Sequence, residues 1–169
     1  MQTITGRVWK FGDNVSTDQI IAAQYAYTLS DPMEMGRHAL EALDKEFASK
    51  VQPGDLIVAG RNWGQGSARE QAVSCLKALQ VGAVIAESFG RIFFRNAFNL
   101  ALPAVICPQA AGDLQAGDKV ELDLAGGVLW ARGETFRFIP PPEFLMELIE
   151  AGGLVNHTRA LLAQEKHDA

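Results

Sequence analysis

The sequence predicts an α/β domain in which a parallel sheet, covered by helices, lies against an antiparallel sheet. The middle of the chain alternates short apolar runs with helical segments, which favours parallel strands joined by helical crossovers. These runs are continuously apolar, as expected for strands buried on both faces. After Pro108 the strands alternate apolar and polar residues and are separated by glycine-containing turns, a pattern typical of antiparallel hairpins.

The length and composition indicate one domain spanning residues 1–169. The 169 residues are 48% hydrophobic, enough for a single core, and no segment resembles a linker. No run approaches the ~20 apolar residues of a membrane helix, and the first residues lack a secretory-signal pattern. The net charge of −5, with no basic stripe, argues against nucleic acid as a partner.

The two cysteines, Cys75 and Cys107, both lie in apolar segments. Two isolated thiols suggest neither a disulfide framework nor a metal cage, so buried core residues are the better interpretation. The histidines also lack metal-ligand spacing, and we expect no metal bound by this chain. A reducing, cytoplasmic location fits these features.

The first third of the chain predicts one strand and one amphipathic helix. The strand is expected over Thr3–Phe11. The helix is expected to begin at Asp31, which can cap it, because Pro32 suits the first helical position. Apolar residues then recur every four positions on one helix face, at Met35, Ala39, Leu43 and Phe47.

The remaining elements follow from apolar runs and their glycine or proline boundaries. Buried strands are expected over Leu56–Ala59, Ala83–Ala86 and Ala104–Cys107, with helices over Ala68–Leu79 and Arg91–Leu100. Antiparallel strands are expected over Val120–Leu124, Val128–Arg132 and Thr135–Ile139. A last helix, Glu143–Ala151, is ended by Gly152-Gly153.

The segment from Gly60 to Glu70 has two interpretations. Its glycines let backbone N–H groups approach a ligand, and a helix N-terminus with Arg69 nearby would make a cradle for a carboxylate or phosphate. However, Ser67 and Glu70 also have the spacing of a capping box, which needs no chemistry. From the residues alone, helix capping explains Ser67 and Glu70 somewhat better than anion binding does. The two interpretations are partly compatible.

Three motifs in a fixed order carry more information than any one of them. The chain reads GDNVSTDQII at residues 12–21, NWGQGSARE at 62–70 and ESFGRIFFRNAFN at 87–99. Taken alone, the first of these is usually a turn and a helix cap. Together they resemble the small subunits of isopropylmalate dehydratase and homoaconitase, and the swivelling domain of aconitase. The likeness extends from Arg7 to Gly153 and implies a swivelling β/β/α domain.

The resemblance implies the small subunit of a two-subunit hydro-lyase, as in leucine biosynthesis. Such enzymes dehydrate a hydroxy-di- or tricarboxylate and rehydrate the alkene at the neighbouring carbon. The 4Fe–4S cluster of the family is carried by the large subunit, the implied partner. Two cysteines could not supply the thiolates of such a cluster.

The resemblance also implies roles for particular residues. Ser67 matches the catalytic base that removes a proton from carbon, which requires cationic or amide groups to stabilise its alkoxide. Arg69 matches the arginine that binds a substrate carboxylate, and Asp18 matches an aspartate at the substrate cleft. The chain departs from most relatives at Gln65, Ala68 and Gln71, where they carry cysteine, serine and histidine.

The resemblance implies that the loop at residues 25–28 sets the choice of substrate. Tyr27 stands at the deciding position of this loop. Tyrosine offers no cation for a third carboxylate, which counts against homoaconitate. It also fills space that an isopropyl group needs, so a methylmalate or dimethylmalate is an alternative substrate. Packing of Tyr27 within its own domain is about equally plausible.

Two further interpretations remain open. The cradle around Gly64–Arg69 could bind an anion without chemistry, which would make the chain a non-catalytic binding module. Arg91 and Arg95 lie four residues apart on one helix face and could also meet an anion, but such pairs are commonly solvated.

Overall fold

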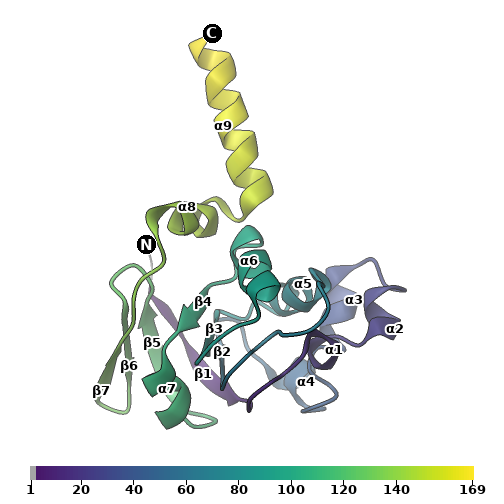
Figure 1. Cartoon of the computed structure of the whole chain (residues 1–169), viewed down its shortest axis with the longest axis vertical. Coiled ribbons are helices and arrows are strands. Elements are labelled where there is room, and N and C mark those ends of the chain that lie inside the picture. Colours follow the sequence, from purple (N-terminus) through teal and green to yellow (C-terminus); the bar gives the residue numbers. More distant parts are fainter. Residues whose placement is uncertain (1–2) are drawn as a thin grey trace.

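The computed structural model describes residues 3–169, which form one mixed sheet with helices packed on it (Figure 1). The strand order is β4-β3-β2-β1-β5-β6-β7. The strands are β1 (Ile4–Lys10), β2 (Leu56–Ala59), β3 (Ala83–Ala86), β4 (Ala104–Ile106), β5 (Lys119–Asp123), β6 (Val128–Ala131) and β7 (Glu134–Arg137). Strands β1 to β4 pair in parallel, and β1, β5, β6 and β7 pair antiparallel. The predicted fold class is therefore confirmed.

Strand β1 joins the two halves of the sheet. Its residues Ile4–Arg7 pair with β5, and its residues Val8–Lys10 pair with β2. The sheet curls at this strand, so that one face of the parallel half packs against the antiparallel half. Their shared core includes Leu56, Val58 and Ile85 from one half and Leu122, Leu129 and Phe136 from the other. The parallel strands are thus buried on both faces, as their continuous apolar runs predict.

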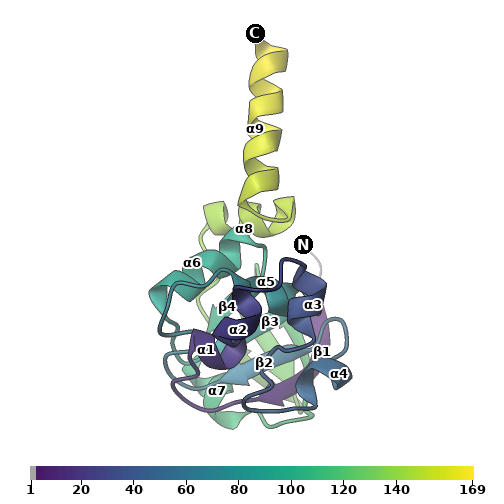
Figure 2. The ribbon, with the colours of Figure 1, turned by 90° about the vertical axis from the view of Figure 1, so that its right-hand side faces the viewer.

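The helices α1 to α6 cover the other face of the parallel half (Figure 2). The helices are α1 (Thr17–Ile20), α2 (Ala23–Ala26), α3 (Pro32–Gly36), α4 (Phe47–Lys50), α5 (Gln71–Ala78), α6 (Arg91–Asn99), α7 (Pro108–Asp113), α8 (Glu143–Ala151) and α9 (Leu154–Asp168). The core beneath them brings Ile57 and Val84 of the sheet against Leu76 and Phe98. Among residues 3–169, no helix is both long and apolar enough to cross a bilayer.

The long helix predicted from Asp31 to Phe47 is wrong. Asp31 does cap α3, its carboxylate accepting from the Met33 N–H at 3.0 Å, but the helix ends at Gly36. The chain then turns, with Leu40 at φ +57° and its N–H donating to the Ile20 carbonyl at 2.8 Å. Of the four apolar side chains with this spacing, Met35, Ala39 and Phe47 are buried and Leu43 is 42% exposed. The segment turns because a tertiary hydrogen bond replaces the helical one.

Helix α9 was missed from the sequence. Gly152 and Gly153, both at positive φ, end α8 as predicted, but they also turn the chain directly into a further helix. Figure 1 shows α9 extending away from the rest of the molecule. The glycine pair therefore forms a tight turn between two helices and does not end the helical part of the chain.

The buried carboxylate of Asp55 fastens β1 to the turn before β2. It accepts hydrogen bonds from the Arg7 N–H (3.0 Å), the Trp9 indole N–H (3.0 Å) and the Gln52 N–H (2.9 Å). Burial alone would raise the pKa of Asp55, but these three donors and the charge of Arg7 hold it below its usual value. The ionised form is therefore the one that the fold stabilises.

We expect Asp55→Asn to lower the free energy of unfolding by about 1–3 kcal/mol at pH 7, because an amide cannot satisfy three converging donors. A depressed pKa in the folded state gives a contribution that is present above the unfolded pKa and lost as pH falls through the folded one. Urea unfolding at pH 7 and in steps below pH 4 should show the two proteins converging in acid. A constant difference across that range would contradict this account.

Candidate active site

The loop from Gly60 to Glu70 follows β2 and lies between two other loops. On one side, the Gly64 N–H donates to the Val15 carbonyl at 2.8 Å, and the Thr17 N–H donates to the Gln65 carbonyl at 2.9 Å. On the other side, the Gly90 N–H donates to the Trp63 carbonyl at 2.8 Å. The three sequence motifs, far apart in the chain, therefore meet at the carboxyl end of the parallel strands.

Glycine at position 64 is required by packing and by backbone conformation. Its φ is +77°, and a Cβ there would lie 2.3 Å from Cγ of Phe93. The neighbouring Trp63 is fully buried, and its ring packs edge-on against the same Phe93 at 6.3 Å between centroids. The loop is thus anchored on α6 and presents the following residues to solvent.

Ser67 is exposed, and it does not cap a helix. Helix α5 begins at Gln71, and Glu70 occupies the cap position without a side-chain hydrogen bond. The predicted capping box of Ser67 and Glu70 is therefore wrong, and so is the predicted helix start at Ala68. The physical reason is a competing contact: the buried Thr17 hydroxyl donates to the Ser67 carbonyl at 2.9 Å and ties this residue to the first motif.

The capping box forms instead in the first motif. The Gln19 N–H donates to Oγ of Ser16 at 3.2 Å, and the Ser16 N–H donates to Oε1 of Gln19 at 3.0 Å. The expectation of a turn and a cap in this motif is thus confirmed. The cap also fixes α1, which carries Asp18 toward Arg69.

Arg69 is only 7% exposed although its side chain is charged. Its Nη1 forms an ion pair with Oδ1 of Asp18 and donates to the Ile21 carbonyl at 3.1 Å. Within residues 3–169, its buried Nε has no hydrogen-bond partner. A buried donor without an acceptor costs free energy. The Arg69 guanidinium can therefore bind one more acceptor through Nε, and such an acceptor would remove this cost.

Tyr27 covers Arg69 from the outside. The guanidinium carbon lies 5.4 Å from the centroid of the Tyr27 ring, within the range of a cation–π contact. Tyr27 is nevertheless 73% exposed, so most of its surface is open to solvent. Gln71 supports the same loop, its Nε2 donating to the Ala26 carbonyl at 3.4 Å.

A hollow of about 440 Å³ lies beside the loop, lined by Gly64–Gly66, Gly90–Ile92 and Arg95. Arg91 and Arg95 therefore face the loop that carries Ser67, a placement that the sequence left open. Their spacing of four residues was the available signal, but spacing alone does not tell which way a helix face points. The hollow combines two guanidinium groups with a glycine-rich backbone, which suits an anion.

The residues of this chain do not fit an iron–sulfur cluster. Cys75 and Cys107 are buried in different hydrophobic cores, and burial raises the pKa of the Cys75 thiol to about 12. A cluster needs several converging thiolates. Among residues 3–169 there is also no group of three His, Cys, Asp or Glu side chains placed to hold a metal ion.

Comparison with known proteins agrees with this arrangement. The sequence profile of the family described as the aconitase C-terminal domain matches residues 7–109. The chain is 51% identical to the 3-isopropylmalate dehydratase small subunit of Nautilia profundicola, over 98% of this chain and 100% of that one. It is 49% identical to the 2,3-dimethylmalate dehydratase small subunit of Eubacterium barkeri, over 92% of this chain and 96% of that one.

A solved structure extends the likeness to three dimensions. The crystal structure described as 3-isopropylmalate dehydratase from Methanocaldococcus jannaschii superposes with a TM-score of 0.94 at 40% identity. The match covers 99% of this chain and 100% of that chain. The chain therefore belongs to the aconitase C-terminal domain family, and the resemblance seen in its motifs is confirmed.

Proposed function

We propose that this chain is the small subunit of a 3-isopropylmalate dehydratase-type hydro-lyase that acts with a large iron–sulfur subunit in leucine biosynthesis. The observation that carries the proposal is the convergence of Ser67, Arg69, Asp18 and Tyr27 at one edge of the sheet. The full-length likeness to small subunits of this type supports it. The large subunit would hold the cluster, and both subunits would work in the cytoplasm.

Ser67 is the proposed base that exchanges a proton with a substrate carbon. A serine hydroxyl is a weak base in water, so its alkoxide needs nearby positive charge. Arg69 lies two residues on, and Arg91 and Arg95 line the adjoining hollow. The exposure of Ser67 and its freedom from helix capping leave its hydroxyl available for this task.

Arg69 is the proposed anchor for a substrate carboxylate. Asp18 and the Ile21 carbonyl both contact Nη1 of the Arg69 guanidinium. These contacts orient the guanidinium and leave its other nitrogens for the substrate carboxylate. Tyr27 contributes a neutral ring at the entrance and no charge for a third carboxylate. The proposed substrate is therefore a 2-hydroxy dicarboxylate with a small apolar substituent.

The name of the Eubacterium relative makes 2,3-dimethylmalate a second candidate substrate. Co-purifying this chain with its large subunit and assaying 3-isopropylmalate, 2,3-dimethylmalate and homoaconitate distinguishes them. We expect turnover of an alkylmalate, none of homoaconitate, and none from either subunit alone. Preferred turnover of homoaconitate, or activity of this chain alone, would overturn the proposal.

A non-catalytic anion-binding module is the rival from another class. In the free chain the Asp18 carboxylate already occupies Arg69. We therefore expect calorimetry of this chain alone to detect no tight binding of phosphate, nucleotides or malate. Micromolar binding of a nucleotide, unaffected by the large subunit, would favour the rival.

Thr17 should position Ser67 through its buried hydroxyl. Thr17→Val keeps the shape but removes the hydrogen bond to the Ser67 carbonyl. We expect about a tenfold loss in kcat with little change in KM, and a loss of about 1 kcal/mol in unfolding free energy. Thr17→Ser should restore both quantities. Equal losses in the valine and serine variants would show that packing, rather than the hydroxyl, matters.

A further inference from the structure

Helix α2, which leads directly into Tyr27, has little to stabilise it on its own. It is four residues long, and its N-cap residue Ala22 makes no side-chain hydrogen bond. Only Ala26 among its residues is buried. One turn of isolated helix is not stable in water, because helix nucleation is costly. Contacts from other segments must therefore hold the Tyr27 ring in its place over Arg69.

A stack of two rings supplies one of these contacts. The Tyr25 ring lies parallel to the His38 imidazole, with 3.7 Å between the centroids and 8° between the planes. Nδ1 of His38 lies 3.0 Å from Oε2 of Glu41, and this contact orients the imidazole. A hydrogen bond from Gln71 to the Ala26 carbonyl also reaches α2, but at 3.4 Å it is long. The stack therefore joins α2 to the segment that follows α3.

The segment that carries His38 is itself fixed close to the candidate site. Its Leu40 is fully buried, and the Leu40 N–H donates to the Ile20 carbonyl at the end of α1 at 2.8 Å. The carbonyl of the next residue, Ile21, accepts from Nη1 of Arg69 at 3.1 Å. His38 therefore belongs to a segment whose backbone is fixed relative to the Arg69 guanidinium.

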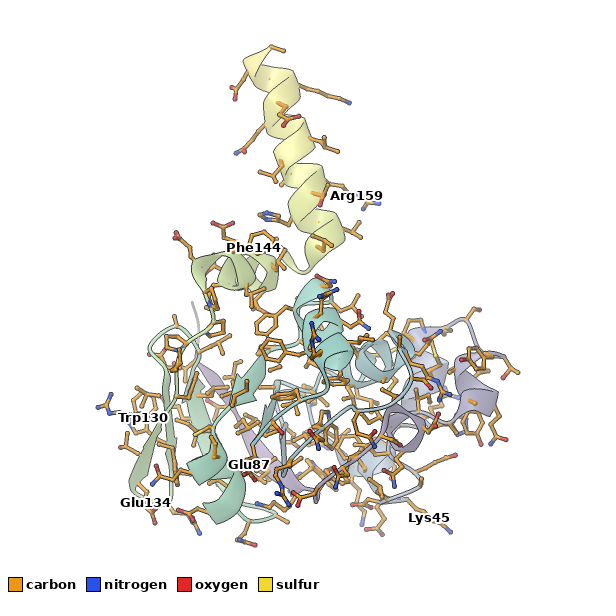
Figure 3. The ribbon with its side chains drawn as sticks, in the orientation of Figure 1. Lys45, Glu87, Trp130, Glu134, Phe144 and Arg159 are labelled. Carbon is orange, nitrogen blue, oxygen red and sulfur yellow. The ribbon has the colours of Figure 1, made fainter. Side chains whose placement is uncertain are left out.

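An open hollow beside the stack makes the imidazole ring necessary. The hollow has a volume of about 500 Å³, is lined by His38 and Ala22, and extends to Asp18 and Lys45. Figure 3 shows Lys45 at the outer edge of the molecule, on the side that carries α1 and α2. Because side chains do not fill this space, packing alone does not keep Tyr25 in one orientation once the imidazole is removed.

We propose that His38 is a positioning residue for the substrate entrance. Its stack on Tyr25 holds α2 in place, and α2 in turn holds the Tyr27 ring over Arg69, with the guanidinium carbon 5.4 Å from the ring centroid. The effect on substrate selection rests on the proposed function, which gives Tyr27 and Arg69 their roles. The placement of Tyr27 by His38 does not rest on it.

The chain has two tyrosines, Tyr25 and Tyr27, so the placement can be measured without any assay of activity. Labelling the full chain with fluorotyrosine gives one fluorine NMR signal for each ring, and Tyr25→Phe identifies them. In His38→Ala the Tyr27 signal should move toward its position in the urea-unfolded chain, although His38 stacks on the other ring. His38→Phe keeps a flat ring beside Tyr25 and should restore the signal. An unmoved Tyr27 signal in His38→Ala would overturn the proposal.

The assembled enzyme tests the consequence for substrate binding. A stacked aromatic pair changes an equilibrium by a factor of about 2 to 10. His38→Ala should therefore raise KM for the preferred alkylmalate by about this factor and leave kcat within about twofold. The preference between 3-isopropylmalate and 2,3-dimethylmalate should narrow, because a less fixed Tyr27 distinguishes them less. His38→Phe should restore both quantities, and a phenylalanine variant no better than alanine would show that the stack is not what acts.

A double-mutant cycle shows whether the two rings act together. Tyr25→Leu should raise KM as His38→Ala does, and the double variant should raise it little further, because both changes remove the same contact. His157→Ala is the matched control, since His157 also packs against an aromatic ring, that of Phe144 at 5.9 Å, but at the base of α9. It should change neither KM nor the Tyr27 signal.

Two kinetic results would contradict the positioning role of His38. One is a loss in the double variant equal to the product of the two single losses, and the other is a kcat that falls as much as KM rises. If the wild-type complex turns over no alkylmalate, the proposed function fails, whereas the fluorine signals still decide whether His38 places Tyr27.

Discussion

Replacing Ser67 by alanine is expected to lower kcat of the assembled enzyme by about 100- to 10,000-fold, the range for loss of a general base. The value of KM should change little, because a base acts mainly in the transition state. Ser67 is exposed and caps no helix, so the free energy of unfolding should stay within about 0.5 kcal/mol of the wild type. Steady-state kinetics and urea unfolding measure both quantities.

The separation of activity from stability is what makes this variant informative. A serine that capped α5 would instead show a loss of about 1 kcal/mol in stability with turnover nearly intact. Ser49→Ala, which changes an exposed serine of helix α4, controls for loss of a surface hydroxyl and should change neither quantity. Near-normal kcat for Ser67→Ala, with the cluster of the large subunit fully loaded, would contradict the assignment of Ser67 as the base.

The strands were predictable because each is short and strongly patterned. All seven strands among the described residues match their predicted ranges, and no end differs by more than two residues (Ile139 predicted, Arg137 observed). Continuous apolar runs mark strands buried on both faces, and glycine-containing turns mark the hairpins. These signals are local, so they can be recognised in the sequence without knowledge of the rest of the fold.

The helices were less predictable where tertiary contacts override local preference. The pattern of a serine followed three residues later by Gln or Glu occurs at Ser16 and at Ser67, but only Ser16 forms the box. At Ser67 the Thr17 hydroxyl and the inward turn of Arg69 hold the chain outside the helix. Such a choice depends on residues about fifty positions away, which no local pattern reports.

The candidate site was predictable as a set of residues but not as an arrangement. The resemblance that the motifs carry pointed to Asp18, Ser67 and Arg69, and the substrate loop of the family it implies pointed to Tyr27. The ion pair of Asp18 with Arg69, and the cover that Tyr27 places over the guanidinium, depend on two loops lying side by side. The same proximity shows why Arg69 stays buried with a charged side chain: its partner comes from the first motif.

Replacing Arg69 by lysine is the second variant with a large expected effect. Lysine keeps the positive charge but loses Nε and the planar fork, and with them a charge-assisted hydrogen bond to a carboxylate worth about 1.5–3 kcal/mol. We therefore expect KM to rise about 10- to 100-fold, with kcat reduced much less than in Ser67→Ala. The direct measurement is KM for the alkylmalate substrate, supported by a dissociation constant for malate in the assembled enzyme.

Asp18→Asn tests what the Asp18 carboxylate contributes to substrate binding by Arg69. The amide removes the ion pair but leaves the guanidinium in place, so KM should rise less than for Arg69→Lys if Asp18 mainly orients the fork. Arg132→Lys is the matched control, since Arg132 also pairs with an aspartate, Asp118, at 3.5 Å and lies outside the three motifs. An unchanged KM in Arg69→Lys, together with a collapse of kcat, would show that Arg69 serves Ser67 rather than the substrate carboxylate.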